Sequence, residues 1–242
     1  MADQSFGAAW TATLAFLRDN ISTLLPVGAA FLFLPQLLFQ FSTQGVVPGD
    51  DMSGQEAVSF LLKLVALMLA SVVGQVTITK LAIGRNDEST VGSAIAASLA
   101  IFVPVVVATM LQSVAVFIGT LLFIVPGLYL IGRLLFTMPV MADGENGPLT
   151  ALKRSWALTD GNGFRLLAYL LVLILGFVAV TLLLGGLGAA VGVITTVAAG
   201  KPAEGWGIGR WLFELFTSGV GALLSMCYIV FIAMLYRAFS RP

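Results

Sequence analysis

The sequence predicts an all-α membrane protein, a polytopic helix bundle of about six transmembrane helices in a single domain over residues 1–242. Three observations lead to this fold class. Hydrophobic residues make up 59% of the chain and charged residues 10%, and the mean hydropathy is +1.02, more than a water-soluble domain of this length can cover with polar surface. Apolar stretches long enough to cross a bilayer recur along the chain. Basic residues fall mainly in alternate connecting segments.

The apolar stretches place the spans. The six predicted spans cover approximately residues 21–41, 57–83, 99–125, 126–142, 164–199 and 208–235. The fourth is short, because the segment between the Pro126-Gly127 pair and Asp143 reaches only about 21 Å at 1.5 Å per residue. We therefore expect this span to begin before the Pro-Gly pair, or the bilayer to thin around it.

The distribution of basic residues predicts the orientation. Eight of the twelve Lys and Arg residues lie in segments that would share one side of the membrane: Arg18, Lys80, Arg85, Lys153, Arg154, Arg165, Arg237 and Arg241. Lys201 and Arg210 would lie on the opposite side. Because cytoplasmic segments carry the excess of positive charge, both termini are predicted to be cytoplasmic.

Amphipathic segments precede the first, third and fifth spans. Residues 5–20 are expected to form an interfacial helix, and residues 91–102 repeat its apolar spacing. Residues 148–160 are expected to form a cytoplasmic helix, with Pro148 in its first turn and Gly161 at its end. The chain can thus be interpreted as three repeated helix-hairpin units. The alternative is that any helix at a membrane interface is amphipathic.

The segment 124–165 carries a motif: a Pro-Gly turn, a short helix with a basic residue, a Pro-Val pair followed by an acidic residue, and a helix with the pattern Ala-Leu-x-x-Ser-Trp-x-Leu-Thr-x-Gly-Asn. Its residues are Pro126, Gly127, Arg133, Pro139, Val140, Ala151, Leu152, Ser155, Trp156, Leu158, Thr159, Gly161 and Asn162. This motif resembles that of the glycerophosphoryl diester phosphodiesterase membrane-domain family and the related YciC-type bacterial inner-membrane proteins.

The resemblance implies a multi-pass protein of the bacterial inner membrane. It does not imply phosphodiesterase activity, because the family takes its name from fusion to a soluble catalytic barrel, and no soluble segment here is long enough to hold one. The residue types agree with this expectation. The chain has no His and one Cys, Cys227, so zinc sites, His bases and an intramolecular disulfide are excluded. We expect no catalytic residues, metal or cofactor, and the zero net charge gives no indication of nucleic-acid binding.

Arg133 is the most unusual residue, because it falls within a predicted span and no carboxylate lies in the middle of any span. A charge at the bilayer centre costs roughly 2.5 to 3.5 kcal/mol. Arg133 either binds carbonyls freed by Pro126 or Pro139, or glutamine side chains, or it binds an anionic group such as a lipid phosphate. Arg133, Lys63 and Gln112 are the candidate lipid-binding or anion-binding residues.

Gly185, Gly188 and Gly192 suggest a second kind of site, a surface for helix packing. They lie in an apolar stretch with no preceding strand, so a dinucleotide-binding loop is not indicated. Small residues at this spacing allow two helices to approach closely in lipid.

The leading function is a non-catalytic lipid-associated scaffold or envelope-homeostasis component, with membrane lipids and other membrane proteins or further copies of the chain as partners. A second hypothesis is a small transporter or channel subunit for a lipid or small anionic solute. Its path would follow a polar strip formed by Gln36, Gln75, Gln112 and Arg133. A third hypothesis is a membrane-embedded lipid enzyme, which would need clustered carboxylates. A continuous polar cavity would favour transport, whereas a dry, closed bundle would favour the scaffold.

Overall fold

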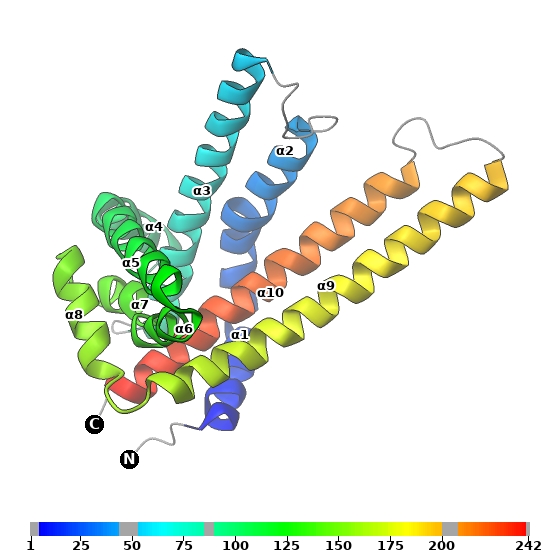
Figure 1. Ribbon diagram of the computed structural model, residues 1–242. Coiled ribbons are helices and arrows are strands. Elements are labelled where there is room, and N and C mark those ends of the chain that lie inside the picture. The colour runs from blue at the N-terminus through cyan, green and yellow to red at the C-terminus, as the bar shows by residue number, and fades with distance from the viewer. Residues whose placement is uncertain (1–4, 44–52, 85–89, 200–207, 241–242) are drawn as a thin grey trace.

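The computed structural model describes residues 5–43, 53–84, 90–199 and 208–240, which are helical with short connections and contain no strand (Figure 1). Six of the described segments are long and apolar enough to cross a membrane: Phe6–Ser42, Gly54–Ile83, Phe102–Leu122, Ile124–Ala142, Gly163–Gly188 and Leu212–Ser240. The predicted all-α bundle of about six spans is therefore confirmed.

The first span is continuous with the helix that precedes it. Helix α1 (Phe6–Gly28) leads through a π-helical segment, η1 (Ala29–Phe33), into α2 (Leu34–Ser42). The predicted boundary between residues 20 and 21 falls at a kink, where Asn20 leaves helical geometry with φ −117° and ψ 15°. The π-helical segment ends two residues before Pro35, which has no N–H to donate to the preceding turn.

Local sequence signals explain where the next helices begin and end. Helix α3 (Gly54–Ile83) starts with a capping box between Ser53 and Glu56 and ends at Gly84, whose φ of +40° favours glycine. Helix α4 (Val91–Ala100) is separate from α5 (Phe102–Leu122). A hydrogen bond of 3.0 Å between the buried hydroxyls of Thr77 and Ser98 joins α3 to α4.

The fourth span is broken in its middle. It begins at Ile124, before the Pro-Gly pair, and consists of α6 (Ile124–Arg133) and α7 (Thr137–Ala142), separated by a turn over residues 134–136. Helix α8 (Pro148–Leu158) follows, then α9 (Gly163–Ala199) and α10 (Ile208–Ser240). The break leaves backbone groups inside an apolar bundle that need partners from elsewhere.

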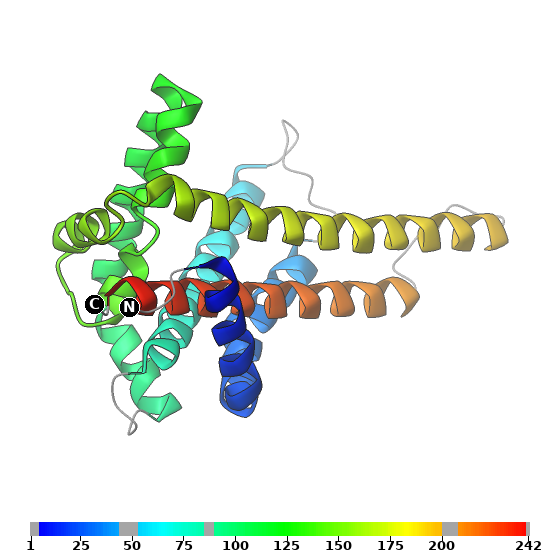
Figure 2. The ribbon, with the colours of Figure 1, turned by 90° about the horizontal axis from the view of Figure 1, so that it is seen from below.

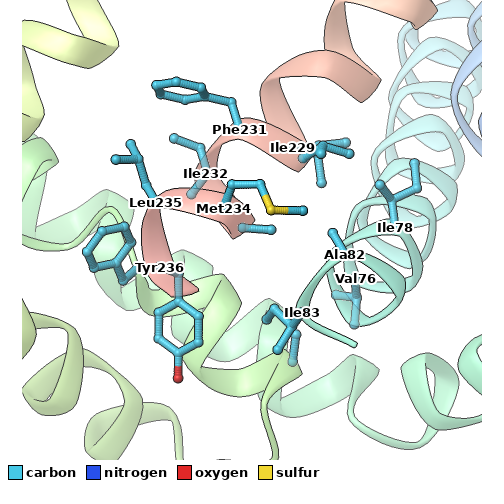
Figure 3. Close-up of a cluster of buried hydrophobic side chains, with 14 of the residues drawn as sticks. Val76, Ile78, Ala82, Ile83, Ile229, Phe231, Ile232, Met234, Leu235 and Tyr236 are labelled. Atoms are coloured by element: carbon cyan, nitrogen blue, oxygen red, sulfur yellow. The ribbon is translucent and has the colours of Figure 1, made fainter. Parts of the chain in front are cut away.

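The helices converge on one apolar core, here called the base, in which the ends of α3 and α10 pack around α7. Figure 3 shows α3 side chains such as Ile78 and Ala82 on the side of α10 that carries Ile229 and Met234, while Leu235 points to the other side of α10. Ile78, Ala82 and Leu235 are fully buried. The described starts of α1 and α9 and the end of α10 also lie near the base (Figure 1).

Away from the base, the helices separate into three hairpins that point in different directions. Figure 1 shows α2 with α3 diverging from α9 with α10, and Figure 2 shows α5 with α6 pointing away from both. The hairpins carry exposed apolar side chains, including Leu121 and Phe123, each 75% exposed. Such surfaces are stable against lipid and not against water. The hairpins occupy the places expected of three repeated units, but a true sequence repeat remains a prediction.

Candidate functional site

Arg133 joins the two halves of the motif. It is the last residue of α6 and only 3% exposed. One terminal nitrogen of its guanidinium donates to the Thr159 carbonyl at 2.7 Å and to the Asp160 carboxylate at 3.0 Å. The guanidinium carbon lies 4.3 Å from the centre of the Trp156 ring. Hydrogen bonds, an ion pair and a cation–π contact therefore hold α6 against α8.

This arrangement corrects the expectation that Arg133 has no carboxylate partner. Asp160 pairs with it from the segment between α8 and α9, outside every predicted span. Neither carbonyls freed by the prolines nor glutamine side chains accept from it. Asp160 is 82% exposed, so Arg133 lies beside a polar surface and not at the centre of the hydrocarbon. Its Nε has no hydrogen-bond partner among the described residues, but this atom is fully buried and an anion cannot reach it.

Ser155 and Thr159 stabilise the break after Arg133. The Ser155 hydroxyl donates to the Arg133 carbonyl and accepts from the Phe136 N–H, both at 3.1 Å. The Thr159 hydroxyl lies 2.9 Å from the same carbonyl. Residues four apart share one face of a helix, so the Ser-x-x-x-Thr spacing in α8 presents both hydroxyls to the turn. These bonds satisfy the backbone groups that the broken span exposes.

Replacing Ser155 with alanine is expected to lower the free energy of unfolding by about 1 to 3 kcal/mol, because the buried Phe136 N–H and Arg133 carbonyl lose a partner. Denaturant-induced unfolding in mixed micelles, followed by circular dichroism, measures the effect. Ser225→Ala is the matched control, since the Ser225 hydroxyl donates only to Gly221 in its own helix. Equal stability of the two variants would contradict the role assigned to Ser155.

The other motif residues shape the backbone around this contact. Gly161 has φ +69°, and the Asn162 side-chain amide donates to the Asp160 carbonyl at 3.2 Å. Gly127 lies so close to Thr120 that a Cβ would overlap the α5 backbone. The remaining motif positions are proline and apolar: Pro126 and Pro139 lie in the first turns of α6 and α7, Ala151 is fully buried and Leu152 is partly buried. The motif residues thus determine how α6 packs against α5 and α8.

The three residues predicted to bind lipid or an anion do not converge on one site. Lys63 donates to the Ser42 carbonyl at the end of α2, at 2.8 Å. Arg133 contacts α8 and the segment after it, and Gln112 lines a cavity that neither of the other two lines. Each side chain belongs to a different contact, and the binding of a lipid or an anion at any of the three stays a prediction.

Two adjoining cavities lie where the hairpins separate. The small cavity, of about 200 Å³, lies between α3, α5, α7 and α10. The large cavity, of about 880 Å³, lies between the α1–α2 segment, α3, α9 and α10. Both are lined by Gln75, Ile131, Tyr228 and Ile229.

The predicted polar strip follows these cavities, except at Arg133. Gln36 lines the large cavity, Gln112 the small one and Gln75 both, whereas Arg133 lines neither. The side-chain amides of the three glutamines and the Tyr228 hydroxyl have no hydrogen-bond partner among the described residues. Tyr228 was not predicted from the sequence; the signal that could have found it is a tyrosine among the apolar residues that follow Cys227.

Gln40 differs from these glutamines because its amide has two partners. Its nitrogen donates to the Glu214 carboxylate and its oxygen accepts from the Ser218 hydroxyl, both at 2.9 Å. Gln40 also lines the large cavity. This contact joins α2 to α10, and it places a negative charge next to a residue of the cavity wall.

The predicted packing glycines have different surroundings. Gly188 lies against the Phe213 ring of α10, and a Cβ there would overlap the ring. Gly185 has open space where a Cβ would lie, so no other described helix of this chain approaches closely at that position. Gly192 lies in the last part of α9, where the structure describes only the helical backbone.

Comparisons with known proteins agree with the motif. A search of curated proteins and a search of solved structures found no match. A family model described as the membrane domain of glycerophosphoryl diester phosphodiesterase matches residues 100–240, which contain α5 to α10 with the Arg133 contact and more than half of the chain. The chain therefore belongs to the glycerophosphoryl diester phosphodiesterase membrane-domain family.

Proposed function

We propose that this protein is a non-catalytic lipid-binding component of the bacterial inner membrane, with both termini in the cytoplasm. In this role it is a scaffold or envelope-homeostasis component that holds a membrane lipid between its hairpins. The observation that carries the proposal is the large cavity, where apolar walls surround a few polar groups without protein partners. Its volume of about 880 Å³ lies within the range of sites that take organic ligands.

The walls of the large cavity suit an acyl chain. Most of the lining side chains are apolar, among them Leu32, Leu67, Leu170, Ile174 and Phe177. The neighbouring helix surfaces are also apolar and exposed, as at Leu175, 66% exposed, and Leu223, 52% exposed. A ligand that reaches the cavity along these surfaces comes from the bilayer and not from water.

The polar groups support binding over catalysis. No acidic, basic or cysteine side chain is among the residues that line the two described cavities. Glutamine amides donate and accept hydrogen bonds but do not transfer protons near neutral pH. They orient a ligand without providing a general acid or base.

A second candidate function is transport of a lipid or small solute. The observation that favours it is the continuity of the two cavities through Gln75 and Tyr228, which extends a polar path from Gln36 to Gln112. Solute flux into proteoliposomes would distinguish this function. A scaffold retains its lipid, whereas a transporter moves it or another solute across the bilayer.

Native mass spectrometry of the protein purified in mild detergent tests the lipid-binding proposal. We expect at least one lipid to remain bound per chain after detergent exchange. Widening the large cavity wall by Phe177→Ala should alter the retained lipid population, because Phe177 lines the cavity. Leu183→Ala is the control, since Leu183 is 70% exposed and is not part of the described cavity wall. A protein that carries no lipid, before or after either change, would refute the proposal.

A further inference from the structure

We propose that the large cavity binds an uncharged lipid of the diacylglycerol class, whose hydroxyl and ester groups bond to Gln36, Gln75 and Tyr228. This inference rests on the proposed lipid-binding function and names the chemical class of its ligand. It depends on two features of the cavity: polar groups without partners, and the absence of cations among the described residues of its lining.

The first feature is the set of unpartnered polar groups. Each glutamine amide offers two N–H donors and a carbonyl acceptor, and the Tyr228 phenol can both donate and accept. None of these groups has a protein partner in the described part of the chain. Polar groups within membrane-spanning helices are costly when unsatisfied, so they need a ligand or water. The ligand they suit has donors and acceptors of its own.

The second feature is that no Lys or Arg is among the described residues that line the cavity. A phosphate or carboxylate headgroup needs charge-assisted hydrogen bonds when it leaves water. Arg133 cannot supply them, since its guanidinium is 3% exposed and is held by Thr159, Asp160 and Trp156. Lys63 bonds the end of α2. An anionic headgroup would therefore find no counter-charge among the described residues of this cavity. The hydroxyl and two ester linkages of a diacylglycerol carry no charge, and its acyl chains match the leucine and phenylalanine walls.

The test compares lipids with identical short chains on the full-length protein. Delipidated protein in mild detergent is titrated with dioctanoylglycerol, dioctanoyl phosphatidic acid and dioctanoyl phosphatidylethanolamine, and the bound fraction is measured by native mass spectrometry. We expect dioctanoylglycerol to bind most tightly. Gln75→Met and Gln36→Met keep the side-chain shape but lose the amide. Each should weaken dioctanoylglycerol binding roughly 3- to 10-fold, the loss expected for one or two hydrogen bonds.

Thr181→Val is the control, because Thr181 lies outside the described cavity wall and its hydroxyl bonds the Phe177 carbonyl of its own helix, at 2.9 Å. It should bind dioctanoylglycerol like the unmodified protein. If Gln75→Met does not fold, Gln36→Met decides, since Gln36 is exposed and its replacement leaves packing intact.

Two results would overturn this inference and leave the proposed function standing: tighter or equal binding of either phospholipid, or unchanged dioctanoylglycerol binding in both glutamine variants. A protein that binds none of the three lipids and retains no native lipid would overturn both.

Discussion

Replacing Arg133 with methionine is expected to lower the free energy of unfolding by about 2 to 4 kcal/mol. The Thr159 carbonyl loses its charged donor at 2.7 Å and keeps the Asn162 N–H at 3.0 Å, and a hydrogen bond to a charged group contributes about 1.5 to 3 kcal/mol. The cation–π contact with Trp156, at 4.3 Å, adds about 1 kcal/mol. The ion pair with Asp160 adds little, since that carboxylate is 82% exposed and screened by solvent.

Unfolding in mixed micelles with increasing denaturing detergent, followed by circular dichroism, measures the change. Arg154→Met is the matched control, because Arg154 is 46% exposed and 4.0 Å from its nearest carboxylate, that of Asp143. Its effect should stay within about 0.5 kcal/mol. If Arg133→Met unfolds like the control, the guanidinium does not join α6 to α8, and its availability to a lipid phosphate would have to be reconsidered.

The fold class and the number of spans could be predicted from the sequence because they follow from local properties. The length of each apolar stretch and the absence of charge within it decide whether it can cross a bilayer. Caps and kinks are local too: Gly161 ends the α8 segment with φ +69°, and the kink at Asn20 falls where the interfacial helix was expected to end.

The partner of Arg133 could not be predicted because it lies far along the chain and outside every span. Only carboxylates within the spans were considered as partners of Arg133. Asp160 was therefore excluded, although it follows Thr159 within the family motif. The pairing depends on the break after Arg133, which lets α6 end beside α8. Hydropathy does not reveal that break, since residues 124–142 form one apolar stretch in which Arg133 is the only charged residue.

The cavities could not be predicted from the sequence either, because they depend on how the helices are arranged in space. Gln36, Gln75 and Gln112 were expected to share a polar strip, but whether they face each other, lipid or a cavity depends on the direction of the three hairpins (Figure 2). No local pattern determines those directions. They follow from close contacts at the base and between helices. At several of these contacts a glycine, which has no Cβ, lets the neighbouring helix approach closely.

Gly132 makes one of these close contacts, directly beside Arg133. It is buried in α6, and a Cβ there would overlap the carbonyl oxygen of Gly163, the first residue of α9. A Cβ on Gly163 would in turn meet the Tyr129 ring and the Arg133 side chain. The two helices therefore touch backbone to backbone at the point where Arg133 is held.

Replacing Gly132 with alanine is expected to lower the free energy of unfolding by about 2 to 3 kcal/mol, because backbone cannot move aside as a flexible side chain can. The separation of α6 from α9 should also weaken the Arg133 contact, so Gly132→Ala and Arg133→Met together should cost less than the sum of their separate effects. Gly185→Ala is the control: open space surrounds Gly185, and alanine favours the helix, so its stability should stay equal or rise slightly. Fully additive losses at Gly132 and Arg133, measured by the same micelle titration, would mean that the glycine contact does not position the arginine.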